Sequence, residues 1–286
     1  MIGNTPLILI DEKRKIYAKM ETHNLTGSVK DRMIKYICDV EVNRGRIVPG
    51  KTTLVEATSG NTGIALSAYA ASIGCKCKII MPENMSEQRK DMMRAFGSEI
   101  IETGFNAFID AIKIRDELIF NNNGEFKEGF FSPLQFQNNL NIECHMAVTA
   151  PEIHSQLSNM SSGTWSAFVH GSGTGGTMMG VKKYLLKSGL KTKCILVEPY
   201  EDNASHGIQG INDGKDFLLE KNNMDNIIKV KTEDAISKMK KMWSEKGLLV
   251  GISSGANVLA AERYVDEFSP EGYVITMLCD RGERYL

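Results

Sequence analysis

The chain has 286 residues, enough for one large domain or two ordinary domains with a substantial buried core. Lysine and arginine together number 34 and aspartate and glutamate 35, so the net charge of −1 excludes a broadly basic nucleic-acid-binding protein. A hydrophobic content of 42% with 24% charged residues also excludes a chain that its charge keeps disordered.

Six cysteines are scattered along the chain without Cys-x-x-Cys spacing, so we expect reduced thiols, with neither a disulfide framework nor a metal site. The N-terminus has no basic segment followed by a long apolar run, which is the pattern of a secretory signal. No stretch approaches the roughly 18 uncharged apolar residues that a membrane span needs. The sequence therefore predicts a cytoplasmic protein that binds neither membranes nor nucleic acid.

Short apolar runs alternate with longer amphipathic stretches along the chain. The runs predict β-strands at residues 16–20, 53–56, 77–81, 99–102, 167–170, 194–198 and 274–278. The stretches predict helices at residues 28–43, 61–74, 86–96, 107–118, 144–157, 177–186, 232–245 and 255–267. This alternation predicts an α/β fold in which helices cover both faces of mostly parallel sheets. Polar stretches at residues 120–129 and 201–216 predict loops, the first near a domain junction.

The first of three loops with the residue types of a binding site is residues 24–32. It leads into a helix and places Lys30 in the first helical turn. There the helix dipole and the neighbouring Arg32 both disfavour an ammonium group. A lysine that favours its neutral form is what a Schiff base with an aldehyde cofactor requires. The alternative is an ordinary solvated surface lysine.

The second loop, residues 56–63, follows a predicted strand and begins the next helix. It offers a run of backbone N–H groups and three hydroxyls at a helix N-terminus, and that arrangement binds a carboxylate or a phosphate. A simple helix cap uses the same residue types. Because four consecutive small polar residues exceed what a cap needs, we predict an anion site.

The third loop, residues 170–177, contains four glycines and two threonines before a helix. It predicts a phosphate cradle, because backbone amides approach closely where no Cβ blocks them. Gly171, Gly173 and Gly176 also fit the G-x-G-x-x-G spacing, and Glu198 lies at the end of the next run, as in nicotinamide-dinucleotide folds. On these residues alone the identity of the phosphate stays open.

Together the three loops resemble one family, the pyridoxal-phosphate enzymes of the cysteine synthase and cystathionine β-synthase group. The resemblance covers essentially the whole chain and begins with Ile-Gly-Asn-Thr-Pro-Leu at residues 2–7. Further similar segments follow in the family's order at residues 27–32, 58–63, 81–83, 85–86, 135–136, 173–177, 251–255 and 282–285. As a set, these segments override the dinucleotide interpretation of the third loop.

The resemblance implies a fold type II architecture like that of the tryptophan synthase β-subunit. Two domains, each a mostly parallel twisted sheet flanked by helices, would hold pyridoxal 5′-phosphate in the cleft between them. The smaller domain, residues 26–132, would bind the substrate carboxylate. The larger domain, residues 1–25 and 133–286, would bind the cofactor. The family also implies a homodimer.

The resemblance assigns roles to individual residues as well. Lys30 would form the Schiff base with the cofactor and move the Cα proton of the substrate. The cofactor phosphate would be held by Gly173, Thr174, Gly175, Gly176 and Thr177. Asn61 would bind the ring hydroxyl, and Ser253 would face the pyridine nitrogen. Since a serine does not hold the ring protonated, β-elimination is favoured over long-lived carbanion chemistry. The substrate would be bound by Thr58, Ser59, Gly60, Thr62, Gln135, Gly210 and Asp213.

The implied reaction is a β-replacement through an aminoacrylate, most directly the synthesis of L-cysteine from O-acetyl-L-serine and sulfide. The alternative uses L-cysteine as the substrate and releases hydrogen sulfide, with water or a thiol as the nucleophile. Asp213 favours this alternative, because a carboxylate there would orient water. Residues 212–217 depart from the family's usual Gly-Ala-Gly-Phe segment, and Lys215 adds a further charge.

Two other departures and two other function classes complete the predictions. Leu25 replaces a common proline, and Arg281 replaces a usual serine before Gly282. A nicotinamide-dependent oxidoreductase stays an alternative through the G-x-G-x-x-G spacing. A non-catalytic homologue that senses sulfur or binds a partner is the other alternative, against which the retained Lys30, Asn61 and Gln135 argue.

Overall fold

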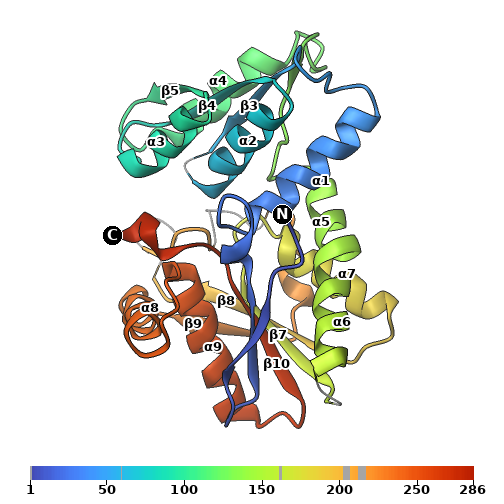
Figure 1. Cartoon of the computed structure of the whole chain (residues 1–286), viewed down its shortest axis with the longest axis vertical. Coiled ribbons are helices and arrows are strands. Elements are labelled where there is room, and N and C mark those ends of the chain that lie inside the picture. The colour runs from blue at the N-terminus through green and yellow to red at the C-terminus, as the bar shows by residue number, and fades with distance from the viewer. Residues whose placement is uncertain (1, 59, 161–162, 202–206, 212–216) are drawn as a thin grey trace. The chain divides into compact units, whose positions relative to one another are not determined.

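The computed structural model describes residues 2–58, 60–160, 163–201, 207–211 and 217–286 (Figure 1). The chain forms two compact units. The larger unit comprises the N-terminal segment up to Val29 together with Gln135–Leu286, and the smaller unit comprises Lys30–Leu134. The predicted assignment of carboxylate binding to residues 26–132 and of cofactor binding to the remainder stays a prediction.

The larger unit is built on a six-stranded sheet with the order β1-β2-β10-β7-β8-β9. Only β1 and β2 pair antiparallel, and every other pair is parallel. The strands are β1 (Leu7–Asp11), β2 (Ile16–Met20), β7 (Trp165–Gly171), β8 (Lys193–Pro199), β9 (Asn226–Val230) and β10 (Tyr273–Leu278). The parallel strands β7 and β8 therefore end at the same edge of the sheet, and the third loop begins there.

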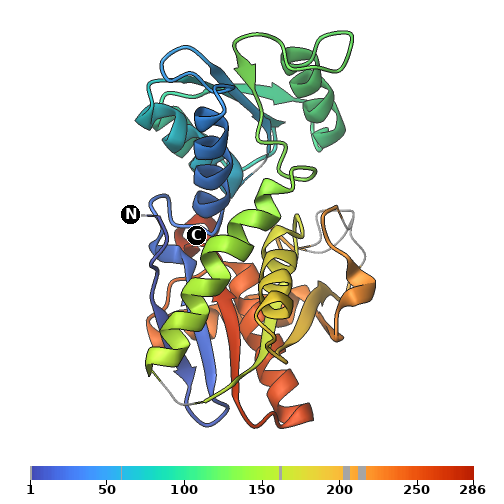
Figure 2. The same ribbon diagram turned by 90° about the vertical axis from the view of Figure 1, so that its right-hand side faces the viewer.

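Helices cover both faces of this sheet (Figure 2). They are α5 (Leu140–Cys144), the π-helical turn η2 (His145–Thr149), α6 (Ala150–Met160), α7 (Gly176–Lys187), α8 (Thr232–Lys246) and α9 (Ile252–Phe268). Short 3₁₀ turns are η1 (Glu21–His23), η3 (Lys221–Asn223) and η4 (Gly282–Tyr285). Phe168 packs with α6 and α7 while its neighbour Val169 packs with α8 and α9. Successive side chains point to opposite faces, so these strands are apolar throughout.

The smaller unit has a four-stranded parallel sheet with the order β5-β4-β3-β6. Its strands are β3 (Thr53–Ala57), β4 (Lys76–Pro82), β5 (Glu99–Thr103) and β6 (Phe130–Phe131), and its helices are α1 (Lys30–Asn43), α2 (Asn61–Ser72), α3 (Glu87–Ala95) and α4 (Phe108–Ile119). Val55 and Ile80 pack with Ala111 of α4 in a common core. The second loop connects β3 to α2 at the carboxyl edge of this sheet.

The predicted α/β class with mostly parallel sheets flanked by helices is confirmed. All seven predicted strands are present, whereas β1, β6 and β9 were missed. The edge strand β9, NIIKV, is partly exposed and lacks a continuous apolar run, and β6 has only two residues. The edge strand β1 does contain four consecutive apolar residues, at positions 7–10, but they overlap the N-terminal motif and were considered only as part of it. Within the described residues, no helix combines the length and apolar character that crossing a bilayer requires.

Candidate active site

The third loop connects the end of β7 to the start of α7 and has no room for side chains at two glycines. Gly175 has φ +93°, and a Cβ there would lie 2.7 Å from the carbonyl carbon of Leu218. A Cβ at Gly176 would overlap the side chain of Asn141. The loop therefore brings its backbone N–H groups together at a helix N-terminus, which is the arrangement that binds a phosphate.

Three buried hydroxyls line the same loop. Thr174 Oγ1 accepts hydrogen bonds from Asn141 Nδ2 at 3.0 Å and from the Gly176 N–H at 3.3 Å. Thr177 Oγ1 lies 3.2 Å from Nε2 of His145. Ser172 is 7% exposed, and its Oγ has no hydrogen-bond partner among the described residues. A buried polar atom without a partner is costly unless a ligand satisfies it, so the loop fits an anion with several acceptor oxygens.

Ser253 lies in the first turn of α9 and is 4% exposed. The same helix is tied to the third loop by the fully buried Asn257. Asn257 Oδ1 accepts the N–H of Gly171 at 2.7 Å, and its Nδ2 donates to the carbonyl of Met277 at 3.0 Å. One amide thus links α9 to the ends of β7 and β10, which fixes Ser253 and the glycine loop on a single rigid frame.

Lys30 is the first residue of α1 and is partly buried. The chain reaches it along the end of β10: the N–H of Val29 donates to the carbonyl of Cys279 at 2.8 Å, and Ser28 forms a backbone bridge with Asp280. These backbone bonds belong to the larger unit and set where the lysine segment begins.

The two residues that depart from the family's pattern around this segment have different settings. Leu25 is 50% exposed. Arg281 instead lies under Gly27, where a Cβ would be 2.7 Å from Arg281 Cδ, and its Nε donates to the carbonyl of Thr22 at 2.8 Å. Because Gly27 also has φ +84°, any side chain at this position is strained. Arg281 therefore supports the turn before Lys30.

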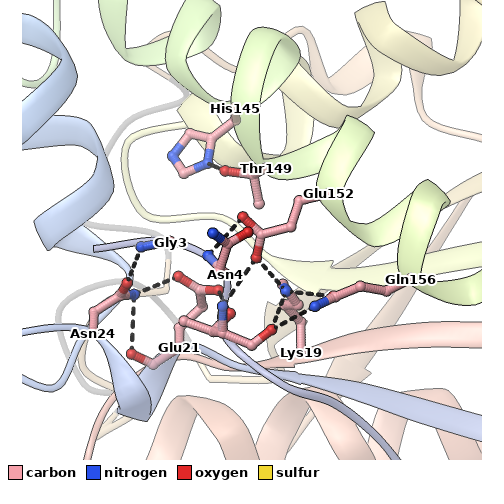
Figure 3. A network of polar contacts seen from close by, with 10 residues as sticks. Gly3, Asn4, Lys19, Glu21, Asn24, His145, Thr149, Glu152 and Gln156 are labelled. Atoms are coloured by element: carbon pink, nitrogen blue, oxygen red, sulfur yellow. Dashed lines mark hydrogen bonds and ion pairs between the residues drawn. The ribbon is translucent and has the colours of Figure 1, made fainter. Parts of the chain in front are cut away.

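A buried polar network holds the N-terminal segment in the larger unit (Figure 3). Glu152 Oε2 accepts the N–H of Asn4 at 2.9 Å, and its Oε1 accepts the N–H of Thr5 at 3.1 Å. Lys19, which is fully buried, forms an ion pair with Glu152. Asn24 accepts the Gly3 N–H at 2.9 Å and donates to the carbonyl of Ser28 at 3.0 Å. The N-terminal motif thus contacts the segment that precedes Lys30.

The second loop lies in the smaller unit. Asn61 begins α2, Thr58 and Thr62 are buried, and Ser59 lies outside the described residues. Thr58 Oγ1 accepts the N–H of Gly60 at 3.4 Å. The sequence did not indicate Arg89 of α3, which is 6% exposed and whose Nη1 would lie 3.8 Å from a Cβ at Gly60. A buried guanidinium beside a helix N-terminus reinforces the positive potential that a carboxylate requires.

The remaining predicted residues fall into three settings. Gln135 is buried, and its carbonyl accepts Asn141 Nδ2 at 3.0 Å, the same side chain that binds Thr174. Gly210 is exposed with φ +82°. Its neighbour Ile211 packs where a Cβ of Gly171 would be. Asp213 and Lys215 lie outside the described residues.

Glu198, which the dinucleotide alternative needs for a ribose, is instead paired with Lys221 at 2.6 Å. This pair engages one of the two carboxylate oxygens.

Comparison with known proteins matches the chain over its whole length. The family described as "Pyridoxal-phosphate dependent enzyme" matches residues 1–280. A cysteine synthase of Staphylococcus aureus (strain Mu50 / ATCC 700699) is 37% identical over 302 aligned positions, which cover 100% of this chain and 94% of that protein. An O-acetylserine dependent cystathionine β-synthase of Helicobacter pylori superposes with a TM-score of 0.89 at 33% identity, covering 100% and 95% of the two chains. A hydrogen sulfide-producing enzyme of Fusobacterium nucleatum superposes with a TM-score of 0.88 at 34% identity, covering 100% and 97%.

Proposed function

Because the chain belongs to the family of pyridoxal-phosphate-dependent enzymes, we propose that it makes L-cysteine from O-acetyl-L-serine and sulfide. The cofactor is pyridoxal 5′-phosphate, as in the family. The full-length similarity to a cysteine synthase supports the reaction class, a replacement at the β-carbon of a small amino acid. The single observation that carries the proposal is the glycine loop before α7, with its close-packed backbone and buried hydroxyls.

The residues of this loop suit the cofactor's phosphate. Gly173 and Gly175 would present backbone N–H groups, and Thr174 and Thr177 would add hydroxyl donors. Gly176 would contribute through its N–H, which holds the Thr174 hydroxyl in place at 3.3 Å. Ser253 would meet the pyridine nitrogen, and Asn61 the ring hydroxyl. When bound, the cofactor withdraws electrons from the amino acid's Cα, which allows the β-substituent to leave.

The chain's own residues would then position the substrate and move its protons. Lys30 would hold the cofactor between turnovers, remove the proton from Cα and later return it. Thr58, Gly60 and Thr62 would bind the substrate carboxylate at the N-terminus of α2. Gln135 would add an amide donor, and the buried guanidinium of Arg89 would add positive charge. These roles assign most of the carboxylate binding to the smaller domain and the cofactor's phosphate and ring nitrogen to the larger. Lys30 and Asn61 of the smaller unit would also bind the cofactor, and Gln135 of the larger unit would also bind the carboxylate.

The second candidate reaction is the release of hydrogen sulfide from L-cysteine. The full-length similarity to a hydrogen sulfide-producing enzyme favours it. We assign the choice of nucleophile to Asp213 and Lys215, in the segment that begins at Gly210. In this reaction Asp213 would orient water or a thiol. A homodimer, which rests on the resemblance, and a cytoplasmic location, which rests on the scattered cysteines and the lack of a secretory pattern, complete the proposal.

Product analysis distinguishes the two reactions. The holoenzyme is incubated with O-acetyl-L-serine plus sulfide, and separately with L-cysteine alone. We expect L-cysteine from the first mixture and little sulfide from the second. Rapid sulfide release from L-cysteine alone supports the second candidate, and turnover in neither mixture refutes both.

A pair of lysine variants on one helix tests the proposed chemistry independently. Lys30→Ala should abolish turnover and covalent attachment of the cofactor, read by mass spectrometry after borohydride reduction. Lys35→Ala is the matched control, because Lys35 lies on the exposed side of α1 and pairs only with Asp39 among the contacts described for it. Attachment that survives Lys30→Ala would assign the cofactor to another lysine.

A further inference from the structure

The helical segment formed by α5 and η2 packs against α7 at two glycines. A Cβ at Gly176 would overlap Asn141, and a Cβ at Gly180 would lie 2.5 Å from Cβ of His145. Both pairs are four residues apart along their helices, so they lie on the facing sides of the two helices. Without these glycines, Asn141 and His145 would not reach the start of α7.

Asn141 determines whether the Thr174 hydroxyl is free to donate a hydrogen bond. Thr174 Oγ1 accepts one hydrogen bond from Asn141 Nδ2 at 3.0 Å and a second from the Gly176 N–H at 3.3 Å. A hydroxyl has two acceptor positions and one proton. Because both acceptor positions are used, the proton is left to donate, and a donor is what an anionic oxygen binds.

His145 controls the second hydroxyl. Its Nε2 lies 3.2 Å from Thr177 Oγ1, and its Nδ1 lies 2.9 Å from Oγ1 of Thr149 (Figure 3). If Nδ1 accepts the proton of Thr149, Nε2 carries the ring's hydrogen and donates to Thr177, whose own proton is then available. The opposite tautomer would consume that proton and turn a lone pair toward the anion.

We propose that Asn141 and His145 are positioning residues, which orient the hydroxyls of Thr174 and Thr177 as donors to the cofactor's phosphate. This role rests on the proposed function of residues 173–177. The π-helical turn that carries His145 and Thr149 is consistent with it, since such turns recur at functional sites. Neither residue would touch the cofactor, and each acts through the threonine beside it.

Affinity for two forms of the cofactor tests this role. Apoprotein is titrated with pyridoxal 5′-phosphate and with pyridoxal, which lacks the phosphate. We expect His145→Leu to weaken binding of the phosphorylated form about tenfold, equivalent to about 1.4 kcal/mol, and to leave pyridoxal binding unchanged. His145→Gln, whose amide N–H replaces the imidazole donor, should recover most of the affinity. Equal weakening of both ligands, or of neither, would overturn the role of His145.

A matched control is available where the next helix, α6, contacts α7. His154 of α6 bonds the hydroxyl of Tyr184 on α7 at 2.7 Å, in the same kind of contact but away from the loop. His154→Leu should leave both affinities at the wild-type value. Should His145→Leu fail to fold, Thr149→Val keeps the ring in place and removes only the partner of Nδ1. This variant should also selectively weaken the binding of pyridoxal 5′-phosphate. Unchanged affinity for pyridoxal 5′-phosphate would contradict the proposal.

A double-mutant cycle separates this role from the function on which it rests. His145→Leu and Thr177→Val should be strongly non-additive, because the histidine acts through the threonine. Additive effects would show that His145 has an independent structural role. If Thr177→Val leaves affinity for pyridoxal 5′-phosphate unchanged, the phosphate assignment of the loop itself fails. If Thr177→Val weakens binding and His145→Leu does not, only the positioning role is refuted.

Discussion

The glycine that precedes α7 offers a quantitative test of the phosphate cradle. Gly175 has φ +93°, and a Cβ at this position would lie 2.7 Å from the carbonyl carbon of Leu218 and 2.9 Å from Cα of Leu219. Both neighbours are backbone atoms, which cannot rotate out of the way. We therefore expect Gly175→Ala to affect both stability and cofactor binding.

The expected loss of stability has three contributions. An L-residue in the left-handed region costs about 1–2 kcal/mol. Overlap with rigid neighbours adds about 1–3 kcal/mol. The reduced freedom of the unfolded chain returns about 0.4–1 kcal/mol. The free energy of unfolding should therefore fall by about 1–4.6 kcal/mol.

Gly189 provides the control at the other end of the same helix. It also has a positive φ, +66°, but among the described residues no atom beyond its chain neighbours would lie within 4 Å of an alanine Cβ at this position. Gly189→Ala should therefore show only the strain and the unfolded-state contribution, a loss of about 0–1.6 kcal/mol. The difference between the two variants isolates the overlap with Leu218 and Leu219.

Urea unfolding of the two apoproteins measures stability, and titration with pyridoxal 5′-phosphate measures binding. Gly175→Ala should weaken cofactor binding at least about tenfold, because relief of the overlap displaces the N–H groups of the loop. Gly189→Ala should bind the cofactor with wild-type affinity. Equal stabilities and equal affinities in the two variants would refute the reasoning from backbone overlap.

Three further predictions concern thiols, pH and substrate. A thiol reagent such as 5,5′-dithiobis(2-nitrobenzoate) should label about one cysteine in the native protein, Cys75, since the other five are buried. Burial also raises the pKa of Cys77 to about 11, which keeps its thiol protonated and unreactive. Labelling of several thiols in the native protein would contradict this prediction. Burial opposes the charged form of Asp225, but the Cys194 N–H and Lys193 outweigh it and lower the pKa of Asp225. Its contribution is therefore full above the unfolded value of 3.8 and is lost as pH falls through the folded value, so Asp225→Ala should destabilise at pH 7 and much less at pH 2 in urea unfolding. Gln135→Ala should raise the half-saturating substrate concentration about 10- to 100-fold with cofactor binding retained, and an unchanged titration would remove Gln135 from the carboxylate site.

Much of the fold could be predicted because its central strands are buried on both faces. Phe168 and Val169 illustrate this: they face different helices, and both must be apolar. The edge strand β9 could not be found in the same way, since its exposed positions alternate with partly buried ones and it contains Asn226 and Lys229. A period-two pattern over five residues is too short to stand out from a loop.

The loops of the candidate site were recognisable because glycines and hydroxyls are concentrated over a few consecutive residues. The side chains that support them were not. Asn141 and Thr174 are 33 residues apart in sequence, and nothing near Asn141 marks it as a partner of the glycine loop. Arg89 is likewise an ordinary arginine in an amphipathic helix until folding brings it beside Gly60. Such residues acquire their role from tertiary packing alone.

The N-terminal motif shows why a resemblance can be specific without indicating a mechanism. Its backbone N–H groups at Asn4 and Thr5 are used to bind Glu152, and the carbonyl of Thr5 accepts the fully buried Lys19. Losing one partner of a buried ion pair typically costs about 3–5 kcal/mol. The network also holds Asn24, which binds the carbonyl of Ser28 two residues before Lys30. We therefore interpret the motif as a structural support for the segment that carries Lys30.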